Sequence, residues 1–231
     1  IQYELHLRYY LWALKYTGFP YAFHTVGSAL AVKALSYVRA GGMNRRQAGE
    51  DFYFIQKLVP AGGYFTLNST TVYPSPRESF RVPFGTGAAM SKLMNEKTNE
   101  YLTYNFDSFR ELESLFGSAG ELYNADKETV AEYYLRLPAG IKSFISREEL
   151  VMKIEEISSN TSGSKSFLKR FFGWFNMFRI VKFLNHVHAG LYEKQPVTVA
   201  ACSLMKATGH EVALSAPEDL LTWFRGIDKR S

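Results

Sequence analysis

The feature that most constrains the fold is a change of pattern near Ser91. Before it, short apolar stretches are separated by Gly-Gly pairs and by Pro74-Ser75-Pro76. After it, apolar residues recur at helical spacing and polar residues suited to helix capping precede them. We therefore predict an α+β, mostly α-helical fold with few strands. We expect the chain to divide near residue 95, into 1–95 and a helical region over 96–231.

The composition is that of an ordinary globular protein. Of 231 residues, 46% are hydrophobic and 21% are charged, which fits neither a disordered nor a membrane-spanning protein. The net charge of +5 is spread along the chain instead of forming a basic stripe, so we expect no nucleic-acid partner. The single cysteine, Cys202, excludes an intramolecular disulfide and fits a cytoplasmic location.

In the first part of the chain, glycines mark where elements are expected to end. Gln2–Trp12 predicts a helix. A short helix over Ala34–Ala40 should stop at Gly41-Gly42, because glycine readily adopts the left-handed backbone of a C-terminal cap. Tyr64–Tyr73 alternates and is rich in strand-forming residues, which predicts a strand.

In the second part, capping residues predict where helices begin. Asp107 is expected to cap a helix that ends at Gly117. Capping boxes at Ser146–Glu149 and Ser215–Glu218 predict two more helices. The run Phe167–Leu191 predicts one long aromatic helix.

A pair of carboxylates, Glu50 and Asp51, follows Gly49 where another helix is expected to begin. One interpretation is structural, because the free N–H groups and the dipole of a helix N-terminus stabilise carboxylates. The other is catalytic, because a carboxylate on a rigid helix start can accept the proton of an attacking hydroxyl. In that interpretation Asp51 is the general base, and Glu50 orients it or holds the acceptor.

The pair and the segments before it resemble a known family. The glycine-led segment from Gly27 and Ser28 to Lys33 is followed by a short helix and the Gly-Gly turn, and Gly49-Glu50-Asp51 then opens the next helix. In this order and spacing they resemble the acceptor-side half of a family 2 glycosyltransferase of the GT-A type. The resemblance covers residues 20 to about 65. Lys33 stands where the family more often has arginine.

The resemblance implies transfer of a sugar from a nucleotide-sugar to the hydroxyl of a sugar or lipid-linked acceptor. It places the family's general base on Asp51, and we assign Gly27 and Ser28 to acceptor binding. It also implies an N-terminal donor-binding half with an Asp-x-Asp site for Mg²⁺ or Mn²⁺. The chain contains no Asp-x-Asp, and we identify no metal ligand in it. We therefore expect it to be a fragment of a longer inverting enzyme and inactive alone.

The loop after the expected strand is a candidate for binding the donor diphosphate. Arg77 and Arg81 precede Gly85 and Thr86. Guanidinium groups bind phosphate with two hydrogen bonds, and glycines allow close backbone approach. The alternative is a surface loop whose arginines are solvated or paired with Glu78.

The aromatic run Phe167–Leu191 leaves a different class of function open. Aromatic rings interleaved with lysines and arginines are typical of helices that lie on anionic membranes. Apolar residues nearly all round a helix are instead typical of a buried one. The alternative to a transferase is therefore a non-catalytic helical interaction or membrane-surface module, with Trp174 and Phe175 in the contact.

Overall fold

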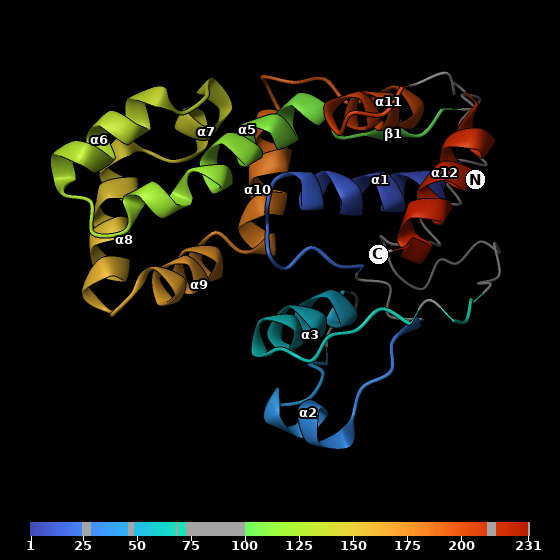
Figure 1. The fold of residues 1–231 in the computed structure, drawn as a ribbon, viewed down its shortest axis with the longest axis horizontal. Coiled ribbons are helices and arrows are strands. Elements are labelled where there is room, and N and C mark those ends of the chain that lie inside the picture. The colour runs from blue at the N-terminus through green and yellow to red at the C-terminus, as the bar shows by residue number, and fades with distance from the viewer. Residues whose placement is uncertain (25–28, 46–48, 68, 73–99, 212–215, 231) are drawn as a thin grey trace. The chain divides into compact units, whose positions relative to one another are not determined.

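The structure is a computed structural model that separates into two compact units (Figure 1). It describes residues 1–24, 29–45, 49–67, 69–72, 100–211 and 216–230. The first unit comprises Ile1–Arg8, Phe23–Tyr101 and Leu214–Ser231, and the second comprises Tyr9–Ala22 and Leu102–Ala213. The α+β, mostly helical class is confirmed. The division into 1–95 and 96–231 stays a prediction.

The helices predicted in the first unit are present. Helix α1 (Gln2–Tyr16) begins in this unit and ends in the second. The others are α2 (Ala34–Arg39), α3 (Glu50–Leu58) with the 3₁₀ turn η2 (Val59–Ala61), and α12 (Pro217–Arg230). Ser215, the first residue of the capping box predicted for α12, lies outside the described residues.

The predicted glycine cap of α2 is confirmed in detail. Gly41 donates to the Val38 carbonyl and Gly42 to the Tyr37 carbonyl, each at 2.9 Å. Both glycines have positive φ, +74° and +68°. These paired bonds form a Schellman motif, which satisfies carbonyls that the end of a helix leaves unpaired.

The prediction of a strand at Tyr64–Tyr73 is wrong over the part of that range that the structure describes. Residues 64–67 and 69–72 contain no strand, and the side chains of Phe65 and Leu67 are 86% and 70% exposed. Strand formers need a paired neighbour and a covered face. The strands of the described chain are β1 (Leu102–Thr103) and β2 (Gln195–Pro196), an antiparallel pair in the second unit.

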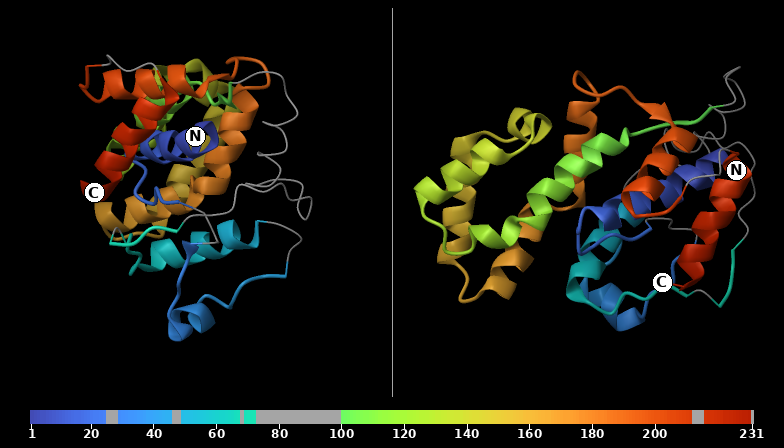
Figure 2. Two further views of the ribbon diagram at one scale, coloured as in Figure 1. Left: turned by 90° about the vertical axis from the view of Figure 1, so that its right-hand side faces the viewer. Right: turned by 45° about the horizontal axis from the view of Figure 1, so that its top comes forward.

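The second unit is a set of short helices. They are α5 (Phe106–Gly117), the 3₁₀ turn η3 (Ala119–Leu122), α6 (Lys127–Arg136), α7 (Ala139–Phe144), α8 (Arg147–Ser159), α9 (Ser164–Trp174), α10 (Met177–Val187) and α11 (Val197–Ala207). Helices α6 and α8 lie side by side, as Figure 2 shows, and α7 packs against both α5 and α10.

Two capping predictions in this unit have different outcomes. Ser146 caps α8 as predicted, since its side chain accepts from the Glu149 N–H at 3.1 Å. Asp107 is not the cap of α5. Asn105 takes that position and accepts from the Asp107 N–H at 3.0 Å, which leaves the Asp107 carboxylate in the first turn.

The prediction of a single aromatic helix over Phe167–Leu191 is wrong. Helix α9 ends at Trp174, and α10 begins after Asn176. Asn176 is extended, with φ −81° and ψ 179°, and its side chain accepts from the Arg179 N–H at 3.2 Å to begin α10. Asparagine competes for backbone hydrogen bonds in this way, which favours caps over helix interiors. Two helices, α9 and α10, therefore replace one.

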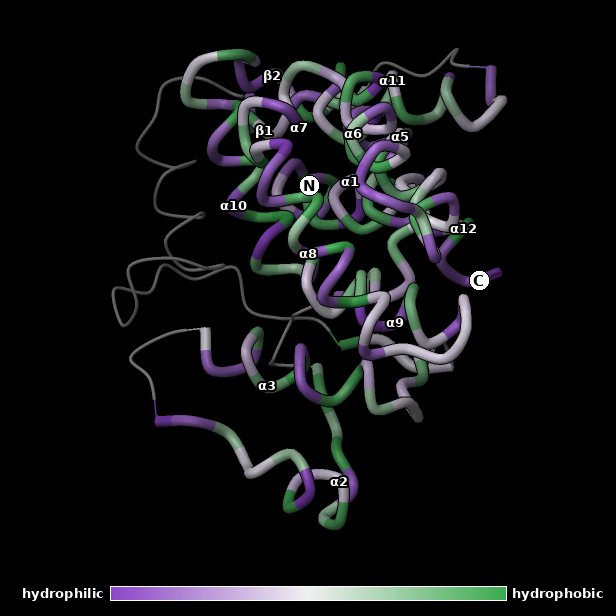
Figure 3. The backbone as a smooth tube through the Cα atoms, turned by 90° about the vertical axis from the view of Figure 1, so that its left-hand side faces the viewer, coloured by the Kyte–Doolittle hydropathy of each residue, from purple (hydrophilic) through white to green (hydrophobic). Residues whose placement is uncertain are grey.

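The aromatic rings of α9 and α10 form the core of the second unit. Phe167, Phe171, Phe175 and Phe183 are fully buried. Phe116 of α5 meets Phe171, Phe172 and Phe175 edge-on, with ring centroids 5.2 to 6.5 Å apart. The alternation of hydrophobic and hydrophilic residues along the helices in Figure 3 agrees with this burial of one face. Of the two interpretations of the aromatic run, the buried one is confirmed for these rings.

Candidate functional site

The predicted acidic pair lies in the first turn of α3. Gly49 precedes it with φ +74° and ψ 12°, a left-handed conformation that strains any residue with a side chain. The Gly49 carbonyl accepts the first helical bond, from the Tyr53 N–H at 3.1 Å. A glycine is therefore what lets the chain enter α3 with both carboxylates in its first turn.

Both carboxylates are half-buried and lie where the helix dipole favours negative charge. Oδ1 of Asp51 accepts from the Phe52 N–H at 2.7 Å, which satisfies one of the N–H groups that the start of a helix leaves free. The hydrogen bond fixes one oxygen of the Asp51 carboxylate. The arrangement can hold an ionised carboxylate in place, as a general base requires.

Helix α3 contacts α2, the short helix of the resemblance, through a ring pair and a hydrogen bond. The ring centroids of Tyr37 and Phe54 are 5.2 Å apart, and Phe54 is buried. Nζ of Lys57 lies 3.5 Å from the Ala40 carbonyl. A side chain at Gly42 would place its Cβ 3.2 Å from the Tyr37 ring. The Gly-Gly turn thus both caps α2 and makes room for its tyrosine.

The remaining predicted site residues lie outside the described residues. They are the acceptor-side pair Gly27 and Ser28 and the diphosphate candidates Arg77, Arg81, Gly85 and Thr86. Glu50 and Asp51 are therefore the predicted site residues to which the structure gives a position, and the binding roles of the other six stay predictions.

The described residues do not provide a metal site. No three His, Cys, Asp or Glu side chains among them gather in a way that could hold a metal ion. These residues thus give no ligand to the Mg²⁺ or Mn²⁺ that the resemblance implies. Within the same part of the chain, no helix is both long and apolar enough to cross a membrane.

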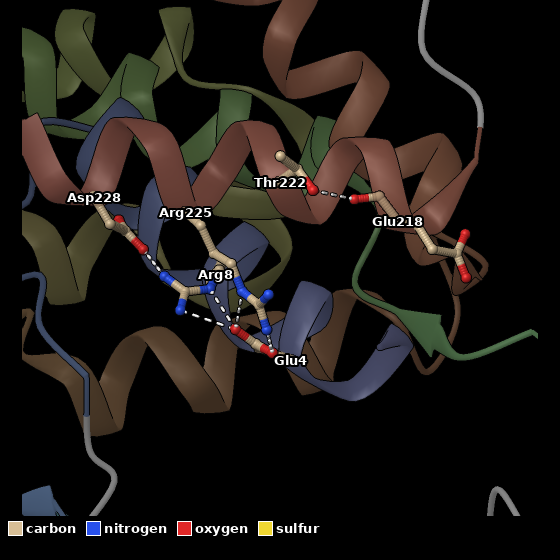
Figure 4. Close-up of polar contacts among 6 residues, drawn as sticks. All are labelled: Glu4, Arg8, Glu218, Thr222, Arg225 and Asp228. Atoms are coloured by element: carbon tan, nitrogen blue, oxygen red, sulfur yellow. Dashed lines mark hydrogen bonds and ion pairs between the residues drawn. The ribbon is translucent and has the colours of Figure 1, made fainter. Parts of the chain in front are cut away.

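Sequence reasoning missed an ion-pair network in the first unit (Figure 4). Glu4 of α1 accepts from Arg8 at 2.9 Å and from Arg225 of α12 at 2.5 Å, and Arg8 also pairs with Asp228. Burial alone would raise the pKa of Glu4, but the hydrogen bonds from Arg225 and Arg8 outweigh it and lower this pKa. The two carboxylates balance the two guanidinium groups, so the network joins α1 to α12 structurally.

Sequence reasoning also missed a buried carboxylate in the second unit. Glu111 of α5 is 7% exposed and accepts from Gly140 N–H at 3.2 Å, Ile141 N–H at 2.9 Å and the Tyr192 hydroxyl at 2.7 Å. Burial, and then the Glu111 carboxylate, raises the pKa of Tyr192, which keeps this hydroxyl protonated as a donor. A Cβ on Gly140 would lie 2.2 Å from Oε2 of Glu111. Glu111 thus caps α7 from another helix.

Two side chains of the second unit that could act as nucleophiles, Ser143 and Cys202, have structural roles or surroundings instead. Oγ of Ser143 lies 3.1 Å from Nε2 of His186, but it donates to the Gly140 carbonyl at 2.8 Å, an ordinary bond within a helix. Cys202 is half-buried on α11, and burial raises the pKa of its thiol. A raised pKa makes the reactive thiolate scarcer. Neither side chain has the surroundings of an activated nucleophile.

Comparison with protein-family models, with curated proteins and with solved structures found no match to this chain.

Proposed function

We propose that this chain is the acceptor-side part of an inverting glycosyltransferase of the GT-A type, with Asp51 as the general base. The observation that carries the proposal is the start of α3. A left-handed Gly49 leads into a first turn that contains Glu50 and Asp51, and Tyr37 of the capped helix α2 contacts Phe54 of α3. The order of these elements, a short helix, a Gly-Gly turn and an acidic pair that opens the next helix, is the order that the resemblance implies.

In the proposed reaction, the oxygen of an acceptor hydroxyl attacks the anomeric carbon of a nucleotide-sugar. The bond from that carbon to the diphosphate breaks, and the nucleoside diphosphate leaves. The Asp51 carboxylate takes the hydroxyl proton, and Glu50 orients Asp51 or holds the acceptor. One displacement inverts the anomeric centre and needs no covalent intermediate.

Other parts of the site are proposed on the same basis. Gly27 and Ser28 are assigned to acceptor binding, and Arg77, Arg81, Gly85 and Thr86 to the donor diphosphate. A divalent metal, Mg²⁺ or Mn²⁺, is expected in the complete enzyme. We place the protein in the cytoplasm, because the single cysteine fits a reducing compartment.

The test is transfer by the protein as its source cell makes it. A panel of nucleotide-sugars is incubated with sugar and lipid-linked acceptors, and released nucleoside diphosphate is measured. The anomeric configuration of the product is then read by proton NMR. Transfer with inversion from one donor supports the proposal. A product that retains the donor's configuration would contradict the single displacement, and release from no donor would contradict transfer itself.

The burial of the aromatic rings weakens the alternative of a membrane-surface module. Phe175, one of the two residues assigned to that contact, is fully buried in the core of the second unit. A buried ring cannot enter a lipid surface while the helix keeps its packing. The alternative now depends on the partly exposed Trp174 and its neighbours, and we do not favour it.

A further inference from the structure

The second unit has a hollow where α9 ends and α10 begins. Its volume is about 340 Å³. Pockets for small molecules in proteins span roughly 300 to 1,000 Å³. The hollow is lined by aromatic, amide and cationic side chains, namely Phe144, Trp174, Asn176, Phe178, Arg179 and Lys182. It is therefore large enough for a small ring-bearing ligand.

The aromatic walls of the hollow differ from the rings behind them. Phe144, Trp174 and Phe178 are half-buried, whereas Phe171 and Phe175 in the same region are fully buried. Trp174 packs edge-on against both of those buried rings, at centroid distances of 5.6 and 5.8 Å, so its position is fixed. Rigid, partly exposed aromatic rings can pack against the apolar part of a small ligand.

The charges of the hollow favour an anion. Cζ of Arg179 lies 4.6 Å from the centroid of the Trp174 ring, and Nη2 pairs with Glu149 of α8. Nε of Arg179 is buried and has no hydrogen-bond partner among the residues that the structure describes. Lys182 is exposed and adds a second positive charge. Glu149 offsets only one of the two, so the lining keeps an excess of positive charge.

We infer that this hollow binds a sugar phosphate, with the sugar ring against Trp174 and the phosphate against Lys182 and Arg179. Guanidinium and ammonium groups form strong charge-assisted hydrogen bonds with phosphate. The residues that carry the inference all belong to the second unit, whereas Asp51 belongs to the first. The site is therefore additional to the transfer proposed above, and its test does not depend on that reaction.

The test is calorimetric titration with glucose 6-phosphate, compared with glucose and with inorganic phosphate. We expect saturable binding of the sugar phosphate that is tighter than the binding of either half alone. Lys182→Glu should weaken it by about tenfold or more, because a charge-assisted contact is replaced by repulsion. Lys169→Glu, at an exposed lysine of α9 that does not line the hollow, is the matched control and should bind like the wild type.

Several results would overturn the inference. They are the absence of binding up to about 10 mM, tenfold above a Kd of about 1 mM that already corresponds to only about −4 kcal/mol, equal affinity for inorganic phosphate alone, and equal weakening by Lys169→Glu. A fourth concerns the source of the phosphate. If Lys182→Glu abolished binding to phosphatidylglycerol vesicles while glucose 6-phosphate did not bind, the hollow would be a lipid contact instead. Circular dichroism of each variant confirms that its helices are intact.

Discussion

Helices α2 and α3 of the first unit are held in a different way from the helices of the second unit. In the first unit, α2 has no buried residue, and α3 buries Phe54 and Ile55. These helices depend on left-handed glycines at their ends. In the second unit, α10 alone buries five side chains, and Phe171 and Phe172 of α9 pack against Phe116 of α5. The acidic pair thus lies on a helix whose start depends on the adjacent Gly49. The helices of the second unit depend instead on a core that they share.

The difference predicts which substitutions should destabilise the whole unit and which should open the chain only locally. A core whose members contact one another loses stability as a whole when one of them is removed. A helix held by its own caps opens locally, with little effect elsewhere. Functional residues are often carried on segments of the second kind.

The largest effect is expected from the core of the second unit. Phe175→Ala should lower the free energy of unfolding by about 3–5 kcal/mol, because a fully buried ring is replaced by a cavity. Phe65→Ala in the first unit, at a ring that is 86% exposed, should change it by less than about 0.5 kcal/mol. Urea unfolding followed by circular dichroism measures both. Equal losses would remove the contrast between the units.

The next largest effect is expected at the buried carboxylate. Glu111→Ala should lower the free energy of unfolding by about 2–3 kcal/mol, because it leaves two N–H groups of α7 and the Tyr192 hydroxyl without their acceptor. Gly140→Ala should also destabilise, because its Cβ would collide with that carboxylate. The exposed Glu128→Ala is the control. An unchanged midpoint of urea unfolding in Glu111→Ala would show that α7 does not need this cap.

A smaller and local effect is expected at the cap of α2. Gly41→Ala should lower the stability of this cap by about 1–2 kcal/mol, because φ is +74° at Gly41 and a side chain is strained in that left-handed conformation. Amide exchange of Gly41 and Gly42 should accelerate while exchange in the second unit stays as it was. Gly226→Ala, in α12 of the same unit, is the opposite control. Its Cβ would meet nothing within 4 Å, so it should stabilise by about 0.5–1 kcal/mol.

The smallest effect is expected at the ion-pair network of α1 and α12. Because the folded pKa of Glu4 is lowered, its contribution is complete above the unfolded value of 4.5 and is lost as pH falls through the folded pKa. Glu4→Gln should cost only about 0.5–1 kcal/mol at pH 7, since solvent screens a partly exposed pair. Thermal melting at pH 7 and at about pH 3 measures the difference. A Glu4→Gln penalty as large at low pH as at pH 7 would contradict this assignment.

The features that were predictable from sequence are those that neighbouring residues determine. The Gly41-Gly42 turn, the Ser146 cap and the acidic start of α3 each involve residues within a few positions of one another. The break at Asn176 was hidden because apolar residues continue on both sides of it. Asparagine three residues before Arg179 was the signal that could have revealed it.

Contacts between distant residues were not predictable in the same way. Glu111 meets Gly140 and Ile141 across 29 and 30 positions, and Glu4 meets Arg225 across 221. Nothing local to Glu4 or Glu111 distinguishes it from an ordinary helix-surface glutamate. The misplaced strand has the same cause. The residues 64–67 and 69–72 have strand-forming side chains, but a partner strand decides whether a ladder forms.

The most direct test of Asp51 as the general base compares two aspartates, each in the first turn of a helix. Asp51→Asn in the protein as the cell makes it should lower kcat/KM for sugar transfer by about 10²–10⁴-fold, the range for loss of a general base. Asp107→Asn, at the equivalent position of α5, should leave transfer unchanged. Both variants should keep the circular dichroism spectrum of the wild type. Near-normal turnover by a folded Asp51→Asn protein would contradict the account.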